Sequence, residues 1–162
     1  MQPFLNRCAE VEETLAQIYT ELAVTVAAEQ ALKNIWLSMA DDEGEHAREI
    51  RMAVRMLKED IVVGEQVPDA EIRQLLAQAR DLLVKVRQSD LTVKEALSLS
   101  LHLEADFRRV HVLCAVRFAD EGLRRVFELL GRADQDHVAR LSDYCRKFAA
   151  LNKGGNGDAA TA

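Results

Sequence analysis

Two histidines in this chain each follow an acidic residue by three positions, a spacing that suits metal binding. They form the pairs Glu43–His46 and Asp134–His137. On a helix, residues three apart lie on the same face, so each pair would present a carboxylate and an imidazole to one point. These two groups are ligands for iron, manganese and zinc. With 27 acidic residues in the chain, this spacing often arises by chance and is weak evidence for a metal site by itself. The positions of the pairs within the predicted helices are needed to test it.

Apolar residues recur at helical spacing along most of the 162 residues, with only 7 Gly and 2 Pro, which predicts an all-α fold. The predicted order is a helical hairpin, a long crossover containing a short helix, and a second hairpin. This is a four-helix bundle with one long connection. The expected helices cover about 5–26, 32–57, 70–88, 92–119 and 123–150.

Local signals mark the ends of these helices. Asp69 is expected to cap the short helix, and Thr92 and Glu95 have the spacing of a capping box, in which each side chain satisfies a free N–H of the helix start. Residues 59–68 lose the helical period and end in proline, so they are expected to form the crossover. We place one domain at 1–152 and a disordered Gly-rich tail at 153–162.

Each of the four long helices has a mostly apolar stripe that is interrupted by one acid, and two of the stripes also contain a histidine. Residues of an antiparallel hairpin face each other when the turn lies midway between them. The midpoints fall near Ala27 in the first hairpin and near Ala119 in the second, so the four acids should lie at one level. The stripe residues that we predict to bind metal are Glu12, Glu43, His46, Glu104, Asp134 and His137.

The two hairpins also repeat one another. Glu12 is followed seven residues later by Tyr19, and Glu104 by His111, which is expected to lie in the core or behind the ligands. An uncompensated carboxylate costs several kcal/mol to bury, and four together would repel each other. Two divalent cations would neutralise them. The alternative is that these acids become neutral through raised pKa values or pair with buried arginine, and that the histidines are ordinary core residues.

Composition excludes several functions. The net charge of -6, with no basic arm, disfavours a nucleic-acid partner. Neither a run of 18 apolar residues nor a signal sequence is present, so we expect no membrane segment and a cytoplasmic protein. Cys8, Cys114 and Cys145 are far apart and odd in number, which argues against a disulfide framework or a zinc knuckle.

Four segments carry a resemblance to a known family. They are Val11-Glu12-Glu13 before Ile18-Tyr19, Asp42-Glu43-Gly44-Glu45-His46, Leu103-Glu104 and Asp134-Gln135-Asp136-His137. With these segments the chain resembles, over about residues 4–150, the rubrerythrin-like branch of the ferritin-like superfamily. The resemblance implies two iron ions, although manganese or zinc would suit the same ligands. It implies bridging by Glu43 and Asp134, terminal binding by Glu12 and Glu104, and one histidine on each iron.

Three features depart from that family. Asp134 stands where a glutamate is usual, Leu101 and Phe107 stand where a second carboxylate could flank Glu104, and no rubredoxin domain is present. The resemblance implies an oxidoreductase that acts on peroxide or oxygen or oxidises ferrous iron, supplied by a separate electron-donor protein. A homodimer is compatible with it. The alternative is a non-catalytic bundle that binds metal or a partner protein.

Overall fold

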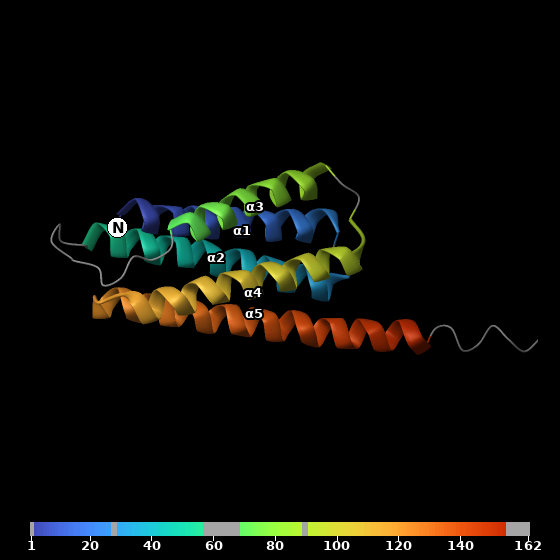
Figure 1. The fold of residues 1–162 in the computed structure, drawn as a ribbon. Helices are drawn as coiled ribbons and strands as arrows, with labels where there is room; N and C mark the ends of the chain where they lie inside the picture. Colours follow the sequence, from blue (N-terminus) through green and yellow to red (C-terminus); the bar gives the residue numbers. More distant parts are fainter. Residues whose placement is uncertain (1, 27–28, 57–68, 89–90, 155–162) are drawn as a thin grey trace, which may run out of the picture.

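The computed structural model describes residues 2–26, 29–56, 69–88 and 91–154, which form helices and no strand (Figure 1). This confirms the predicted all-α class. The helices are α1 (Gln2–Thr25), α2 (Gln30–Met56), α3 (Asp69–Gln88), α4 (Val93–Arg117) and α5 (Glu121–Gly154).

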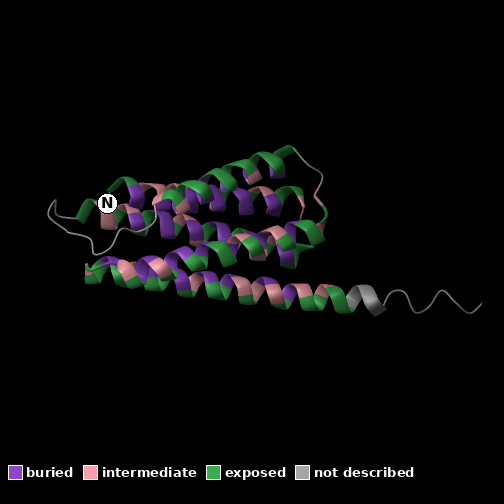
Figure 2. Cartoon of the chain, viewed as in Figure 1, coloured by how far each residue is buried: buried purple, intermediate pink, exposed green. Residues whose placement is uncertain are grey.

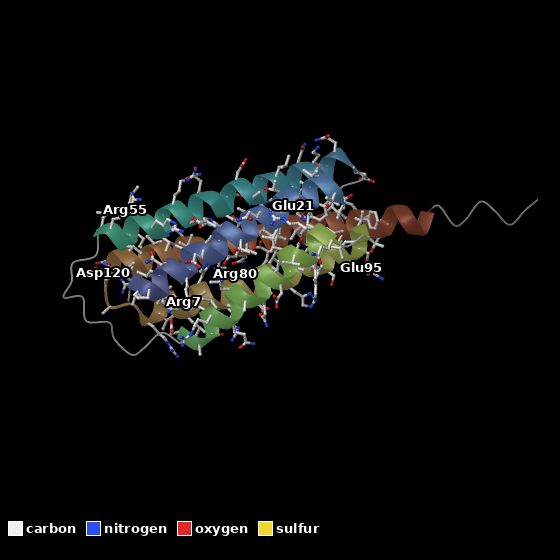
Figure 3. The ribbon with its side chains drawn as sticks, turned by 90° about the horizontal axis from the view of Figure 1, so that it is seen from above. Arg7, Glu21, Arg55, Arg80, Glu95 and Asp120 are labelled. Atoms are coloured by element: carbon white, nitrogen blue, oxygen red, sulfur yellow. The ribbon has the colours of Figure 1, made fainter. Side chains whose placement is uncertain are left out.

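The bundle is built from two helical hairpins. α1 packs along α2, α4 packs along α5, and the hairpins meet through α2 and α5 (Figure 1). The short helix α3 lies against α1, where most of its apolar residues are buried and two of its arginines contact acids of α1. Arg80 binds Glu10 at 2.9 Å and Arg87 binds Glu21 at 2.8 Å along this contact. Figure 3 labels Arg80 on α3 and Glu21 on α1. α3 therefore covers one side of the bundle and stands outside the four-helix core.

The buried faces of the helices point toward one another and the exposed faces point outward (Figure 2). The core includes Trp36, Met39, Phe107 and Phe127, each at most 2% exposed. The Trp36 indole N–H donates to Ser100 Oγ at 3.2 Å, which satisfies its one polar atom. Because the outward faces are polar, no helix among the described residues is apolar over a length that could cross a membrane.

The helix boundaries agree with the predicted ranges to within a few residues. α5 begins at Glu121 where 123 was expected, because the Asp120 carboxylate accepts from the Leu123 N–H at 2.8 Å and so caps the helix. α5 ends at Gly154, beyond the predicted end at 150. The predicted crossover, the first hairpin turn and most of the predicted tail lie outside the described residues.

The start of α4 has the predicted capping box. Glu95 N–H donates to Thr92 Oγ1 at 3.3 Å, and Thr92 N–H donates to Glu95 Oε2 at 2.9 Å. Thr92→Ala should therefore lower the free energy of unfolding by about 1 kcal/mol, measured by urea denaturation.

The matched control is Thr20→Ala, which removes an exposed hydroxyl that bonds only to the Ala16 carbonyl inside α1. It should leave stability unchanged or raise it slightly, because alanine favours helix interiors. An equal loss in both variants would contradict the role of the cap.

Candidate metal centre

All six predicted metal-binding residues lie inside the bundle, none more than 8% exposed. Glu12 comes from α1, Glu43 and His46 from α2, Glu104 from α4, and Asp134 and His137 from α5. Each is set into an otherwise apolar stripe, so the helical periodicity that buries the core also buries these polar groups.

Five of the six residues form two groups whose ligand atoms lie within 4.8 Å of one another. One group is Glu12, Glu43 and His46, and the other is Glu43, Glu104 and His137. Glu43 belongs to both, and its two oxygens face different histidines. Glu43 Oε2 lies 2.8 Å from His46 Nδ1, and Glu43 Oε1 lies 3.1 Å from His137 Nδ1. This is the geometry of a carboxylate placed between two cation positions.

Asp134 is buried at the same centre but lies outside both groups. Its Oδ2 atom is hydrogen-bonded at 2.8 Å to Nδ1 of His111, whose Nε2 lies 2.8 Å from Glu12 Oε1. The structure thus brings Glu12, His111 and Asp134 together in a row. The bridging role predicted for Asp134 remains a prediction.

Two contacts join the hairpins, and in each an aromatic or imidazole side chain of one hairpin contacts a glutamate of the other. Tyr19 of the first hairpin donates its hydroxyl to Glu104 Oε1 of the second at 2.5 Å, while His111 of the second contacts Glu12 of the first. The repeat in the sequence contains the signal for both, since each ring follows an acid by seven residues. The contacts also show that α1 and α4 run antiparallel at this level.

One further contact at this centre was not predicted from the sequence. Asp42 Oδ2 lies 3.1 Å from His137 Nε2, the ring nitrogen that faces away from the centre, and accepts from Arg140 at 2.9 Å. Asp42 directly precedes Glu43 and lies off the buried stripe, so the spacing gave no signal for it. His102, by contrast, is exposed, and its Nδ1 atom lies 2.7 Å from the Ser98 carbonyl of its own helix.

In the metal-free protein, protons balance the charge of this centre. Burial raises the pKa of Glu12 to about 8, although His111 opposes the change. Burial also raises the pKa of Glu104 to about 7 against a hydrogen bond from His137. Burial alone would lower the pKa of His137, but its hydrogen bond to Glu104 and its close contact with Glu43 outweigh this and raise it to about 11. Burial acts against ionisation of Glu43 too, yet the close contact with His137 and the hydrogen bond from His46 lower its pKa.

The side chains fit divalent metal ions. Glu12 Oε1, Glu12 Oε2 and Glu43 Oε1 are buried without an aligned hydrogen-bond donor in the described part of the chain, since the contact of His111 with Glu12 is close but not aligned. A buried acceptor without a donor costs about 1–3 kcal/mol, more when it is charged. No ion pair among the described residues joins an arginine to any of the four acids, so the predicted alternative of arginine pairing has no support there. Cations held by carboxylate and imidazole would satisfy these atoms.

The pKa values predict how metal-free stability depends on pH. Glu12 and His137 have native pKa values of about 8 and 11, above the ordinary 4.5 and 6.5. Between pH 6.5 and 9 the native state therefore holds more protons than the unfolded state, and stability must fall as pH rises. The midpoint of urea unfolding of the chelator-treated protein should be lower at pH 9 than at pH 6.5.

The control for this pH dependence is the metal-loaded protein. Metal binding replaces these protons, so affinity should rise with pH and the loss of stability should shrink or reverse. A metal-free protein whose stability is constant or rises over this range would contradict the proton balance.

The phase of α1 predicts different outcomes at two neighbouring glutamates. Glu12 is 1% exposed and faces the centre, whereas the Glu13 side chain is 46% exposed and binds Arg51 through both oxygens at 2.9 Å. Glu12→Ala should remove about one of two metal equivalents per chain, and Glu13→Ala should retain both. The measurement is metal content after anaerobic ferrous loading and desalting. Equal losses would mean that α1 is rotated from the orientation described.

One of three comparisons with known proteins found a match, and it agrees with this geometry. No curated protein and no solved structure matches the chain. The family model described as Rubrerythrin matches residues 3–144, a range that includes all six predicted ligands and both hairpins up to Tyr144 of α5. A bundle with two groups of buried glutamate and histidine suits that family, and this chain belongs to the rubrerythrin family.

Proposed function

We propose that the protein is a di-iron oxidoreductase that reduces peroxide or oxygen. The observation that supports this most directly is Glu43, whose two oxygens face the two groups of metal-binding side chains. When bound, two iron ions at one carboxylate supply the two electrons needed to cleave an O–O bond. Manganese or zinc would suit the ligands, but zinc does not change its oxidation state.

The side chains have separate tasks in this proposal. Glu43 would offer one oxygen to each of the two metal positions, Glu12 and Glu104 would each bind at one position, and His46 and His137 would complete the two sets. The burial of all five excludes bulk water. In such a low-dielectric space, fixed carboxylates interact with cations more strongly than they would in water.

Two outer residues hold this arrangement in place. Asp42 accepts from Nε2 of His137, so that nitrogen would keep its proton when Nδ1 loses its own and offers a lone pair to a metal. The Tyr19 hydroxyl donates to Glu104 Oε1 and leaves Glu104 Oε2 on the side of His137. Burial, reinforced by the charge of Glu104, raises the pKa of Tyr19 well above its usual value, so this hydroxyl keeps its proton.

Turnover requires a source of electrons. Reduction of each peroxide molecule consumes two electrons, which must be replaced before the next turnover. The proposal therefore includes a separate electron-donor protein as partner. It also places the reaction in the cytoplasm, where the free thiols of Cys8, Cys114 and Cys145 are compatible with a reducing environment.

A second candidate function is a bundle that binds metal without catalysis. The contact of Asp134 with His111 favours it, because Glu43 is then the one acid among the described residues that belongs to both groups. The two candidates differ in whether the bound ferrous ions react with an oxidant.

The test is stopped-flow mixing of the anaerobic ferrous protein with hydrogen peroxide, followed by the near-ultraviolet absorption of the ferric product. The protein should react faster than ferrous ion alone in the same buffer, and Glu43→Gln should abolish the excess rate because it removes the shared carboxylate. A matched control is Glu45→Gln, which alters an exposed glutamate of the same helix paired with Arg48. Wild-type protein that binds two metals but reacts no faster than free ion would favour the non-catalytic bundle.

A further inference from the structure

The two halves of the centre differ where the sequence repeat departs from symmetry. Tyr19 has one polar atom and uses it on Glu104. Its counterpart His111 has two ring nitrogens on different edges, and these lie 2.8 Å from Glu12 and 2.8 Å from Asp134. A histidine at this position can therefore engage two carboxylates at once, whereas a tyrosine can donate to one.

Asp134 is the acid that His111 engages most firmly. The contact with Asp134 is an aligned hydrogen bond, whereas the contact with Glu12 is not aligned and leaves both Glu12 oxygens without a donor. Asp134 is also one methylene shorter than Glu43, its counterpart in the repeat. The carboxylate that would complete a second bridge is short, and it is bonded to an imidazole on α4.

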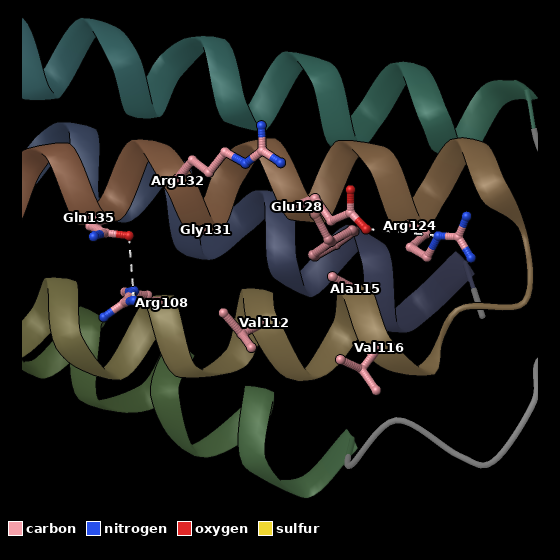
Figure 4. Close-up of a pocket in the computed structure, with 10 residues that line it drawn as sticks. Arg108, Val112, Ala115, Val116, Arg124, Glu128, Gly131, Arg132 and Gln135 are labelled. Atoms are coloured by element: carbon pink, nitrogen blue, oxygen red, sulfur yellow. Dashed lines mark hydrogen bonds and ion pairs between the residues drawn. The ribbon is translucent and has the colours of Figure 1, made fainter.

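The surroundings of His111 hold its ring in place. The ring is 2% exposed, and its centroid lies 5.7 Å from that of Phe127 and 6.4 Å from that of Phe107. Across the helix contact, a Cβ atom at Gly131 would lie 3.6 Å from His111 Cβ. Gly131 lines the groove between α4 and α5, so the two helices approach closely there (Figure 4). These contacts pack the ring between α4 and α5, beside Asp134.

The other half of the centre has different support. In the half formed by Glu43, Glu104 and His137, Asp42 contacts the His137 ring and Tyr19 donates a hydrogen bond to Glu104. In the first half, no hydrogen bond to His46 Nε2 occurs within the described ranges, and Ala133 stands where the repeat would place the counterpart of Asp42. Outer partners of metal ligands typically change affinity by about 10–100-fold.

We propose that His111 is a positioning residue that holds Asp134 away from the metals and thereby makes the two metal positions unequal. The group Glu43, Glu104 and His137 binds first and tightly, and the group Glu12, Glu43 and His46 binds second and more weakly. The inference rests on the proposed function only in that the centre binds two metal ions; it does not require catalysis.

The test is titration of the metal-free protein with cobalt(II), followed by visible absorption and equilibrium dialysis. Wild-type protein should bind two ions with dissociation constants that differ by about 10–100-fold. Asp134→Asn keeps an oxygen that can accept from His111 but removes the negative charge, and it should leave both constants within about twofold of wild type. His111→Tyr restores the residue of the repeat and frees Asp134, so it should tighten the second constant.

The outcomes separate the inference from the proposed function. Two equal constants in the wild type, or the loss of a metal in Asp134→Asn, would overturn the inference and leave the di-metal centre intact. Wild-type protein that binds no metal would overturn both. A His111→Tyr protein whose helical circular dichroism matches wild type but whose second constant is unchanged would also overturn the inference. Asp134→Asn tests independently whether Asp134 binds a metal.

Discussion

The constraint on which the rest of the structure depends is electrical neutrality in a dry interior. Four carboxylates and three histidines lie at one level of the bundle, each at most 8% exposed. Ionised groups at such a site cost several kcal/mol each unless they are paired or bound to a cation. The metal-free protein meets this constraint with protons, since the pKa values of Glu12, Glu104 and His137 are all raised. Metal binding would meet it with cations in place of protons.

The same constraint explains why the hairpins must be packed in one register. Glu104 has its tyrosine and Glu12 its histidine only because α1 and α4 run antiparallel with these residues level. A shift by one helical turn, about 5.4 Å, would leave each acid without its partner. The polar contacts therefore specify the packing of the two halves, while the apolar stripes supply most of the burial.

Much of this arrangement was predictable from the sequence because it is periodic. The core stripes identified the helices and placed all six predicted residues in the interior. Asp42 was not predictable in the same way, because its side chain reaches His137 across a helix contact and follows no repeat of its own. The position of Asp134 outside both groups also depends on side-chain direction. Helical phase predicts the face on which a residue lies, but it does not predict which neighbouring side chain a short carboxylate will bond to.

The two departures of the second hairpin from the first are physically linked. His111 replaces a tyrosine of the repeat and Asp134 replaces a glutamate, and these two residues bond to each other at 2.8 Å. An aspartate opposite a tyrosine would lack the donor that His111 supplies, so the two residues form a satisfied pair. If His111 keeps Asp134 there when metal binds, as proposed, one acid of the four is withheld from the metals. A duplicated frame can thus become asymmetric at its centre while both hairpins retain the same apolar packing.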